Sequence, residues 1–342
     1  MQALILAGGE GTRLRPLTTS VPKPVIPLAG RPFLTFMIDW LASHGVDQVI
    51  LSCGFLAEGV EAVLGERHGD VALRYVNERE PLGTGGPVKL AEGEGLLEDR
   101  FLVLNGDVLT DIDVGAELAL HERSGARVTL ALAEVEETAS YGVVPTAADG
   151  QVEAFLEKQE GPVPTNRINA GCYIVEREAL SLIDAGRPAS LERDLFPRLV
   201  GDGLYGYLAD GYWMDIGTPE RYLQGTWDLL AGDPPSDLPA RDESGSLVYE
   251  PTITAGAQIG PQAVIGPHCS VGSDARIERS VLHSDVSVGP DAVVLESVLA
   301  TGVRVGQGAR IEAQTIVGQG ARIGPGAQLP PGSRIEPGAE VD

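Results

Sequence analysis

The stretch Leu4-Ile5-Leu6-Ala7-Gly8-Gly9-Glu10-Gly11-Thr12-Arg13-Leu14-Arg15-Pro16, followed by Pro22-Lys23-Pro24, joins an apolar strand to a glycine-rich loop and two cationic side chains. Glycines let backbone N–H groups approach an anion closely. Arg13 presents a rigid donor fork for phosphate oxygens, and Lys23 presents a compact charge. The stretch therefore predicts a polyphosphate site at the C-terminal end of a strand. The alternative is an ordinary turn between a strand and a helix.

The glycine spacing excludes the two best-known nucleotide loops. Gly8, Gly9 and Gly11 are followed by Thr12-Arg13-Leu14, so the G-x-G-x-x-G spacing of dinucleotide-binding folds is absent. The G-x-x-x-x-G-K-[ST] spacing of the P-loop is absent as well. If the loop binds phosphate, it belongs to another class of site.

Length and composition bound the kind of protein. A chain of 342 residues suits two domains. It has no apolar run of about 18 residues, and we expect no transmembrane helix. The N-terminus enters a strand directly, so we expect no signal peptide. The three cysteines (Cys53, Cys172 and Cys269) lie far apart, which favours a reduced, cytoplasmic compartment over a disulfide framework or a zinc site.

The formal net charge is −24. Only 10 acidic residues and 6 arginines follow Leu247, so most of the negative charge lies before it. An acidic surface repels nucleic acid and anionic membranes, and we expect neither as a partner. A phosphate site in such a body needs a local cationic cluster together with a divalent cation.

Strand and helix patterns alternate from Gln2 to Ala133, and the strands are continuously apolar. This pattern predicts a mostly parallel sheet with helices on both faces. Ligands of such sheets bind at the carboxyl ends of the strands. The opening loop, a second glycine loop (residues 81–87) and Asp107 all follow predicted strands.

The next section, to about residue 231, reads as a mixed extension of the sheet. It holds the segments Phe155-Leu156-Glu157-Lys158 and Asn169-Ala170-Gly171 at strand ends. The segment Trp213-Met214-Asp215-Ile216-Gly217-Thr218-Pro219 places a carboxylate in a turn before a helix. Residues 232–246 are rich in Gly, Pro, Asp and Ser, which indicates a linker.

From Leu247 to Val341 an aliphatic residue recurs every six residues, with two places where the spacing shortens by one. This hexapeptide repeat predicts a parallel β-helix of about five to six coils. We expect it to be a rigid assembly domain without chemistry of its own. Some hexapeptide helices are acyltransferases with a histidine base. His268 and His283 are the only candidates here, and we expect both to face solvent.

With these motifs in place, the chain resembles the sugar nucleotidylyltransferases, or nucleotide-sugar pyrophosphorylases. The matching motifs are L-A-G-G-x-G-T-R-L-x-P-L-T (6–18), P-K-P (22–24), L-G-T-G-G (82–86), N-G-D (105–107), F-L-E-K (155–158), N-A-G (169–171) and W-M-D-I-G-T-P (213–219). The resemblance covers the whole length. It implies a Rossmann-like catalytic domain (1–231), a linker (232–246) and a left-handed β-helix (247–342).

Among subfamilies the chain looks most like the mannose-1-phosphate guanylyltransferases. The Pro81–Gly86 loop and the Ile168–Tyr173 strand fit that group. Short thymidylyltransferases have a base-reading Gln in the second glycine loop, and Gly86 takes its place here. A glucose-1-phosphate transferase that uses dTTP or UTP stays open. So do a silent regulatory subunit that senses a nucleotide sugar, and a bifunctional enzyme with an acyltransferase β-helix.

The resemblance implies that an NTP and a sugar 1-phosphate give an NDP-sugar and pyrophosphate, with Mg²⁺ as cofactor. Arg13, Lys23, Asp107 and Asp215 would be catalytic, and the two aspartates would hold the metal. The nucleotide would be bound by residues of both glycine loops: Leu6, Ala7, Gly8, Gly9, Gly11, Thr12, Gly83, Thr84 and Gly85. The sugar phosphate would be bound by Gly142, Glu157, Lys158 and Asn169. We also expect a homo-oligomer formed through the β-helix.

Each of these residues also has a structural interpretation. An aspartate after a buried strand, such as Asp107, is often a helix cap or a turn residue. Adjacent Glu157 and Lys158 are often a solvated surface pair. Asp215 can have a purely structural role, in which its side chain orders its own turn.

Overall fold

The computed structural model describes residues 1–78, 80–158 and 161–342. Contacts divide the chain into two compact units. The first holds Met1–Gly9 and Leu34–Trp213, and the second holds Glu10–Phe33 and Met214–Asp342. The opening glycine loop is therefore divided, because Gly8 and Gly9 belong to the first unit and Gly11 to the second.

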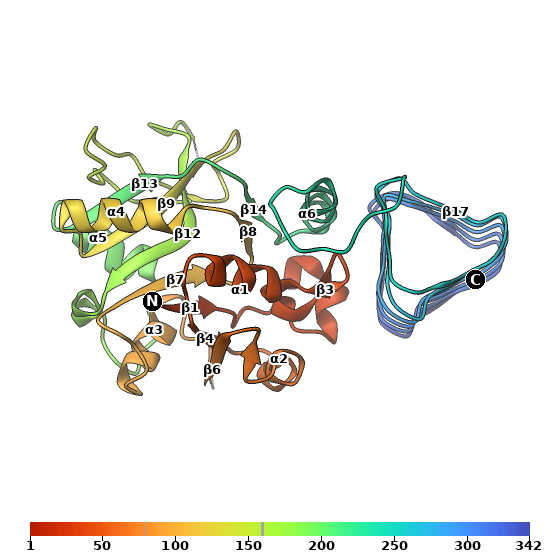
Figure 1. Ribbon diagram of the computed structural model, residues 1–342, viewed down its shortest axis with the longest axis horizontal. Coiled ribbons are helices and arrows are strands. Elements are labelled where there is room, and N and C mark those ends of the chain that lie inside the picture. The colour runs from red at the N-terminus through yellow and green to blue at the C-terminus, as the bar shows by residue number, and fades with distance from the viewer. Residues whose placement is uncertain (79, 159–160) are drawn as a thin grey trace. The chain divides into compact units, whose positions relative to one another are not determined.

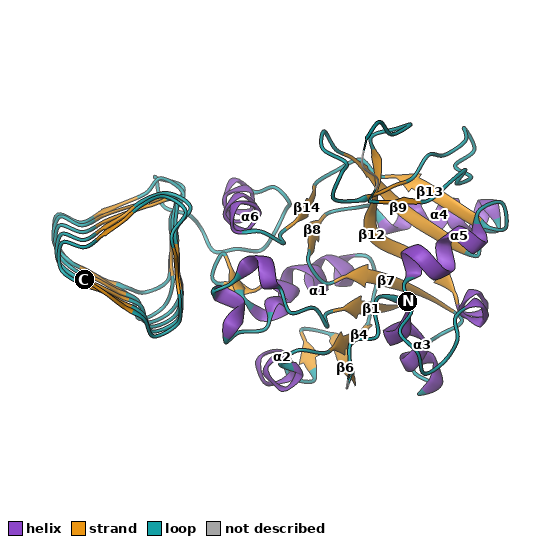
Figure 2. Cartoon of the chain, turned by 180° about the vertical axis from the view of Figure 1, so that it is seen from behind, coloured by secondary structure: helices purple, strands orange, loops and turns teal. Residues whose placement is uncertain are grey.

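The first unit is built on a ten-stranded sheet in the order β11-β10-β12-β7-β1-β4-β6-β5, with β9 beside β12 and β13 beside β9 (Figure 2). Its strands are β1 (Gln2–Leu6), β4 (Gln48–Cys53), β5 (Arg67–His68), β6 (Val71–Asn77), β7 (Arg100–Asn105), β9 (Val128–Glu134), β10 (Gly142–Val143), β11 (Leu156–Glu157), β12 (Arg167–Glu176) and β13 (Leu204–Leu208). Strand β1 runs parallel to β4 and β7, and β12 runs antiparallel to β7 and β9. The predicted mixed, Rossmann-like sheet is confirmed.

The central strands are covered on both faces. Residues 3–5, 49–51 and 101–104 are at most 1% exposed, although successive side chains point to opposite faces. Helices and short helical segments supply the cover: α1 (Phe33–Ser43), α2 (Ala57–Leu64), α3 (Gly85–Gly93), α4 (Val114–Ser124), α5 (Phe196–Leu199), η4 (Arg177–Leu182) and η5 (Leu191–Leu195). A short strand, β8 (Val108–Thr110), follows β7.

The second unit begins with the segment Glu10–Phe33, which contains three 3₁₀ turns and a small hairpin. These elements are η1 (Thr12–Leu14), η2 (Leu17–Thr19), η3 (Lys23–Val25), β2 (Pro27–Leu28) and β3 (Arg31–Pro32). After β14 (Trp213–Asp215) comes helix α6 (Pro219–Ala231), whose first turn is capped by the Thr218 side chain. The predicted domain boundaries at 231 and 247 stay a prediction.

The rest of the second unit is a parallel β-helix whose coils stack as a three-sided prism, seen end-on in Figure 1. Its three sheets hold six, six and five strands, as the predicted five to six coils require. The strands are β15 (Leu247–Val248), β16 (Thr252–Ile253), β17 (Gln258–Ile259), β18 (Val264–Ile265), β19 (Ser270–Val271), β20 (Arg276–Glu278), β21 (Val281–Leu282), β22 (Ser287–Val288), β23 (Val293–Leu295), β24 (Val298–Leu299), β25 (Arg304–Val305), β26 (Arg310–Ile311), β27 (Ile316–Val317), β28 (Arg322–Ile323), β29 (Gln328–Leu329), β30 (Arg334–Ile335) and β31 (Glu340–Val341).

The repeat residues form the ladder inside the prism. Ile265, Val271 and Ile277 are at most 1% exposed and belong to its continuous apolar core. The first position differs from the prediction. Val248, not Leu247, lies in register with Ile265 and packs against the core, because the first step of the repeat is also one residue short.

The two histidines of the β-helix differ in exposure. The His268 side chain is 79% exposed, as expected. The prediction for His283 was wrong, because its residue exposure is only 6%. Its ring packs against helix α6, where Nε2 lies 3.1 Å from the Tyr222 hydroxyl. A histidine buried against another element is a poor general base for a substrate in solvent.

Candidate active site

In the first unit, the opening loop continues directly from the parallel sheet. The Ala7 N–H donates to Ser52 O at 2.8 Å, and Gly106 N–H donates to Leu6 O at 2.9 Å. Side chains are excluded at Gly8, because a Cβ there would lie 2.6 Å from Glu78 Oε1. Gly9 has nothing within 4 Å of its Cβ position. Of the predicted loop residues Leu6–Gly9 at the end of β1, Ala7 is buried and only Gly9 is exposed.

The second glycine loop is fixed by the segment around Ala189. Gly83 has φ +76°, and a Cβ there would lie 2.4 Å from Ala189 O. Gly85 and Gly86 both donate their N–H groups to that carbonyl, at 2.8 and 3.3 Å. Thr84 donates to Glu192 Oε2 at 2.5 Å. Because these donors are already used, the loop is suited to packing against a base rather than to holding phosphate.

Glu78 joins the two glycine loops, although no sequence motif singles it out. Its Oε1 accepts from Ser52 Oγ at 2.8 Å, and its Oε2 accepts from Leu82 N–H at 3.0 Å. One carboxylate thus lies against Gly8 and holds the start of the second loop. Its place directly after β6 was the only sequence signal.

Asp107 lies at the end of β7, beside the end of β1. Gly106 allows this approach, because a Cβ there would lie 2.6 Å from Leu6 O. The Asp107 residue is partly buried. A partly buried carboxylate at the carboxyl ends of two parallel strands fits the predicted role of metal ligand.

The residues predicted for the sugar phosphate gather on β10, β11 and the start of β12. Gly142 pairs with Glu157, and a Cβ on Gly142 would lie 3.0 Å from Glu157 Oε2. Lys158 has φ +43°, and its Nζ lies 3.8 Å from Glu157 Oε1. Burial raises the pKa of Glu157, and the charge of Lys158 opposes that rise. Lys158 is 61% exposed and can reach an anion.

Asn169 is engaged within its own strand. Its amide donates to Tyr173 OH at 2.8 Å, and its Oδ1 accepts from Gly171 N–H at 3.0 Å. These bonds stabilise the irregular stretch of β12 between Asn169 and Tyr173. One amide hydrogen remains for a sugar hydroxyl.

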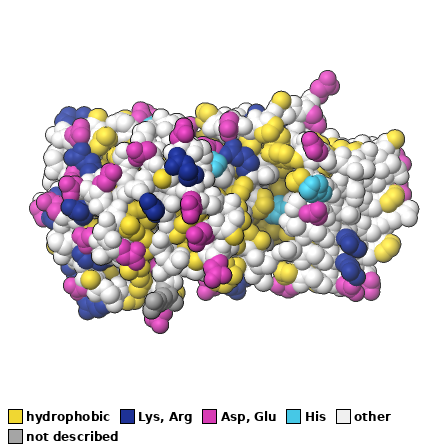
Figure 3. All heavy atoms as spheres, turned by 60° about the horizontal axis from the view of Figure 1, so that its bottom comes forward, with side chains coloured by type: hydrophobic (Ala, Val, Ile, Leu, Met, Phe, Trp, Pro, Cys, Tyr) yellow, Lys and Arg dark blue, Asp and Glu magenta, His cyan; other side chains and the backbone are white. Residues whose placement is uncertain are grey.

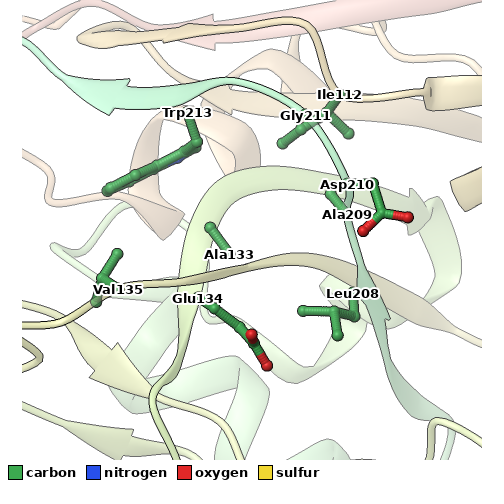
Figure 4. A pocket seen from close by; sticks show the side chains of 9 residues that line it. All are labelled: Ile112, Ala133, Glu134, Val135, Leu208, Ala209, Asp210, Gly211 and Trp213. Carbon is green, nitrogen blue, oxygen red and sulfur yellow. The ribbon is translucent and has the colours of Figure 1, made fainter.

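A cavity of about 300 Å³ lies beside these strands, with Trp213 in its wall (Figure 4). The indole N–H of Trp213 donates to Ala170 O at 2.8 Å, and its ring meets that of Tyr141 edge-on, with centroids 5.3 Å apart. The other lining residues are Ile112, Ala133, Glu134, Val135, Leu208, Ala209, Asp210 and Gly211. Trp213 thus lines the cavity and also contacts Tyr141, the residue before Gly142.

The second unit brings together the other predicted residues. The Arg13 guanidinium lies 3.9 Å from Asp215 Oδ2, and Arg221 lies 3.2 Å from the same oxygen. Gly217 makes this possible, since a Cβ there would lie 2.5 Å from Arg13 Nη2 and 2.7 Å from Asp215 Oδ1. The Asp215 side chain is only 12% exposed, whereas that of Arg13 is 58% exposed. The opening loop and the D-I-G-T-P turn therefore form one cluster.

Lys23 packs beneath the same loop. Its residue exposure is 9%, and a Cβ on Gly11 would lie 3.1 Å from Lys23 Cβ. Gly11 has φ +61°, and its carbonyl accepts from Thr18 Oγ1 at 2.8 Å. Thr12 begins the turn η1 and presents Arg13 on it. The loop conformation thus depends on glycine at position 11.

Comparison with known proteins identifies the family. The model of the nucleotidyl transferase family matches residues 2–232. The chain belongs to the nucleotidyl transferase family. A second model, the GMPPB C-terminal domain, matches residues 247–341 of this family member. Enzymes of this kind generally use a divalent metal.

The family member has curated relatives along most of its length. It is 40% identical to a mannose-1-phosphate guanylyltransferase of Mycobacterium tuberculosis (strain ATCC 25618 / H37Rv), over 84% of this chain and 80% of that protein. It is 36% identical to mannose-1-phosphate guanylyltransferase 1 of Arabidopsis thaliana, over 93% and 91% of the two chains. The solved structure of HddC from Yersinia pseudotuberculosis covers 67% of this chain, with 29% identity and a TM-score of 0.58.

The carboxylates present fit a metal ion that takes its remaining ligands from the bound substrate. Within the described residues, no group of three or more His, Cys, Asp or Glu side chains could hold an ion by itself. Asp107 and Asp215 each offer a carboxylate that is at least partly buried. Mg²⁺ is commonly held by one or two carboxylates together with phosphate oxygens and water. Asp107 belongs to the first unit and Asp215 to the second.

No helix in the described part of the chain combines the length and apolar character needed to cross a bilayer. On the face in Figure 3, acidic and basic side chains are interspersed rather than gathered into a basic stripe.

Proposed function

We propose that the protein transfers GMP from GTP to mannose 1-phosphate, giving GDP-mannose and pyrophosphate. The observation that carries the proposal is the cluster of Arg13, Asp215 and Gly217, together with Lys23 packed against Gly11 of the same loop. It combines a phosphate-binding fork with a largely buried carboxylate suited to a metal. The names of the relatives from M. tuberculosis and A. thaliana supply the base and the sugar.

The reaction is an in-line displacement at the α-phosphorus. An oxygen of the sugar phosphate forms the new bond to phosphorus, and the bond to the β-phosphate breaks. The attacking oxygen is already anionic, so no general base is needed. Catalysis then consists of positioning and charge neutralisation. Arg13 binds the leaving pyrophosphate, and Lys23 neutralises charge near the α-phosphate.

Asp107 and Asp215 hold Mg²⁺ in this proposal. The ion supplies charge neutralisation at the phosphate oxygens. The protein's part is to present one carboxylate from the end of β7 and one from the turn before α6. Loop residues Leu6–Thr12 bind the triphosphate, and Gly83–Gly85 pack against the base.

The sugar phosphate is bound by Lys158 and its neighbours. Lys158 is the exposed cation of this group, and Glu157 lies beside it. Glu157, Asn169 and Gly142 are adjacent across β10, β11 and β12, which suits contacts with several hydroxyls of one ring. We also propose that the protein is cytoplasmic and forms homo-oligomers through its β-helix. Three free, buried cysteines suit a reducing compartment.

A rate panel tests the function. Purified full-length protein is mixed with each of four NTPs and with mannose 1-phosphate or glucose 1-phosphate, and pyrophosphate release is measured. We expect the highest kcat/KM with GTP and mannose 1-phosphate. Highest turnover with dTTP or UTP and glucose 1-phosphate would replace the proposal with the alternative transferase. Binding of GDP-mannose without release from any pair would favour a regulatory subunit.

The acyltransferase alternative has its own test. Thiol release from acetyl-CoA, lost on His268→Ala, would establish a second activity in the β-helix. The buried position of His283 counts against that histidine as the base. We expect no release.

A further inference from the structure

The β-helix contacts the segment that carries the predicted phosphate-binding residues. Within the second unit, the Tyr222 hydroxyl on α6 donates to the carbonyl oxygen of Pro27. His283 of the β-helix lies behind it, with Nε2 at 3.1 Å from the same hydroxyl. Tyr222 is 1% exposed and His283 6%. A chain of hydrogen bonds thus runs from the β-helix through α6 to the strand that follows Lys23.

The chemistry of the three groups assigns the direction of each bond. A tyrosine hydroxyl has one hydrogen, and Pro27 O can only accept it. His283 must then carry its proton on Nε2 and donate to the Tyr222 oxygen. Burial lowers the pKa of His283 to about 4, so its ring is neutral at pH 7. The Tyr222 hydroxyl therefore donates once, to Pro27 O, and accepts once, from His283 Nε2–H.

A second tyrosine holds the same hairpin. Tyr249 directly follows β15, and its hydroxyl donates to Ala29 O at 2.9 Å. Its ring fills the space beside Gly30, where a Cβ would lie 2.3 Å from Tyr249 Cε2. Ala29 and Gly30 both have positive φ, at 46° and 83°, in the turn against which the Tyr249 ring packs.

The hairpin in turn fixes Lys23. Turn η3 is closed by Ile26 N–H donating to Lys23 O at 3.2 Å, and Pro27 is the next residue. Prolines at 22, 24 and 27 restrict φ along this stretch. A shift of the Pro27 carbonyl therefore moves the Lys23 backbone, and with it the side chain packed beneath Gly11.

We infer that Tyr222, Tyr249 and His283 are positioning residues for Lys23, and that the β-helix is thereby part of the catalytic apparatus rather than a scaffold alone. This inference rests on the proposed function, in which Lys23 acts at the α-phosphate. None of the three residues touches a substrate in this account. They act through the backbone of residues 23–30.

The kinetic test uses Tyr222→Phe and Tyr249→Phe in the full chain. Each removes one hydroxyl and keeps the ring. We expect each to lower kcat about tenfold, the factor that corresponds to about 1.4 kcal/mol for one hydrogen bond. KM for mannose 1-phosphate stays within about twofold, because the sugar residues lie on β10–β12. Tyr75→Phe is the matched control, since its hydroxyl also donates to a backbone carbonyl, that of Gly65, and both residues belong to the first unit.

Two further measurements separate positioning from general damage. His283→Gln retains a donor and should keep most of kcat, whereas His283→Leu should lose it. In a Lys23→Met background, Tyr222→Phe should cause no further loss, because residues that act through one group are not additive. An equal loss in both backgrounds, or wild-type kcat in Tyr222→Phe, would overturn the inference.

Amide hydrogen exchange keeps the inference testable if the function proposal fails. We expect faster exchange at Val25 and Ile26 in Tyr222→Phe than in wild type, and no change in Tyr75→Phe. If wild-type protein prefers another NTP, the same variants are compared with that NTP. Unchanged exchange at these amides contradicts the inference whatever the substrate is.

Discussion

Replacing Gly217 by alanine tests the cluster of Arg13 and Asp215 directly. The backbone at Gly217 has an ordinary φ, so alanine introduces no backbone strain. Its Cβ would lie 2.5 Å from Arg13 Nη2 and 2.7 Å from Asp215 Oδ1, against at least 3.4 Å for ordinary contact. To restore ordinary contact, Arg13 Nη2 must move by about 0.9 Å and Asp215 Oδ1 by about 0.7 Å relative to the new Cβ.

The loss of kcat depends on how far the Arg13 and Asp215 side chains are displaced. Arg13 is 58% exposed and its end can swing away, while the Asp215 side chain is only 12% exposed. Either shift displaces a group that must meet phosphate or metal. A misplacement of about 1 Å costs on the order of 100-fold in rate. We expect kcat to fall about 30- to 100-fold, with a stability loss of only about 1–2 kcal/mol from overpacking.

The assay is steady-state pyrophosphate release with GTP and mannose 1-phosphate, alongside thermal unfolding. Gly93→Ala is the matched control. Gly93 also lacks a positive φ and has nothing within 4 Å of its Cβ position, and it ends helix α3. We expect that variant to keep wild-type kcat. If Gly217→Ala also kept it while folded, Arg13 and Asp215 would not act at the reacting phosphates.

Three other substitutions have distinct expected outcomes. Asp107→Asn should reduce turnover by orders of magnitude with the fold kept, and near-wild-type rates in saturating Mg²⁺ would show that metal ligation is misassigned. Lys158→Met should raise KM for mannose 1-phosphate at least about tenfold, because a charged hydrogen bond to the sugar phosphate is lost, and should leave KM for GTP little changed. Equal changes in the two KM values would contradict the assignment of Lys158 to the sugar phosphate. Burial raises the pKa of fully buried Glu117 well above its usual range. In the unfolded chain Glu117 has an ordinary pKa of about 4.3, so it loses its proton above that pH while the native protein keeps it. The free energy of unfolding therefore falls by about 1.4 kcal/mol per pH unit as pH rises from there toward the native pKa. Glu117→Gln removes this fall, and denaturant titrations from pH 5 to 8 should be flatter than for wild type; parallel profiles would show that Glu117 is ionised in the native state.

Local patterns predicted much of the fold. The six-residue spacing fixed which residues face the inside of the prism, except at Val248, where a one-residue step was hidden by two adjacent aliphatic residues. Continuous apolar strands predicted a sheet buried on both faces, since polar alternation would have indicated one exposed face. The six-residue spacing and the apolar runs both depend on residues that are close in the sequence, so they can be recognised without an alignment.

Contacts between distant segments could not be predicted in this way. Nothing local to residues 10–33 indicates that this segment joins the β-helix unit. The burial of His283 depends on Tyr222, which lies 61 positions earlier. Glu78 and Glu117 are single acids whose partners come from other strands, such as Ser52 and Cys172. Such residues become visible only when the tertiary contacts are known.

The products of a single incubation show whether the protein makes GDP-mannose. Purified full-length protein is mixed with Mg²⁺, GTP and mannose 1-phosphate, and the products are quantified by chromatography and mass spectrometry. We expect GDP-mannose and pyrophosphate in equal amounts, at a rate above that for any other pair of NTP and sugar 1-phosphate. Absence of GDP-mannose, or faster formation of a dTDP- or UDP-sugar, would contradict it.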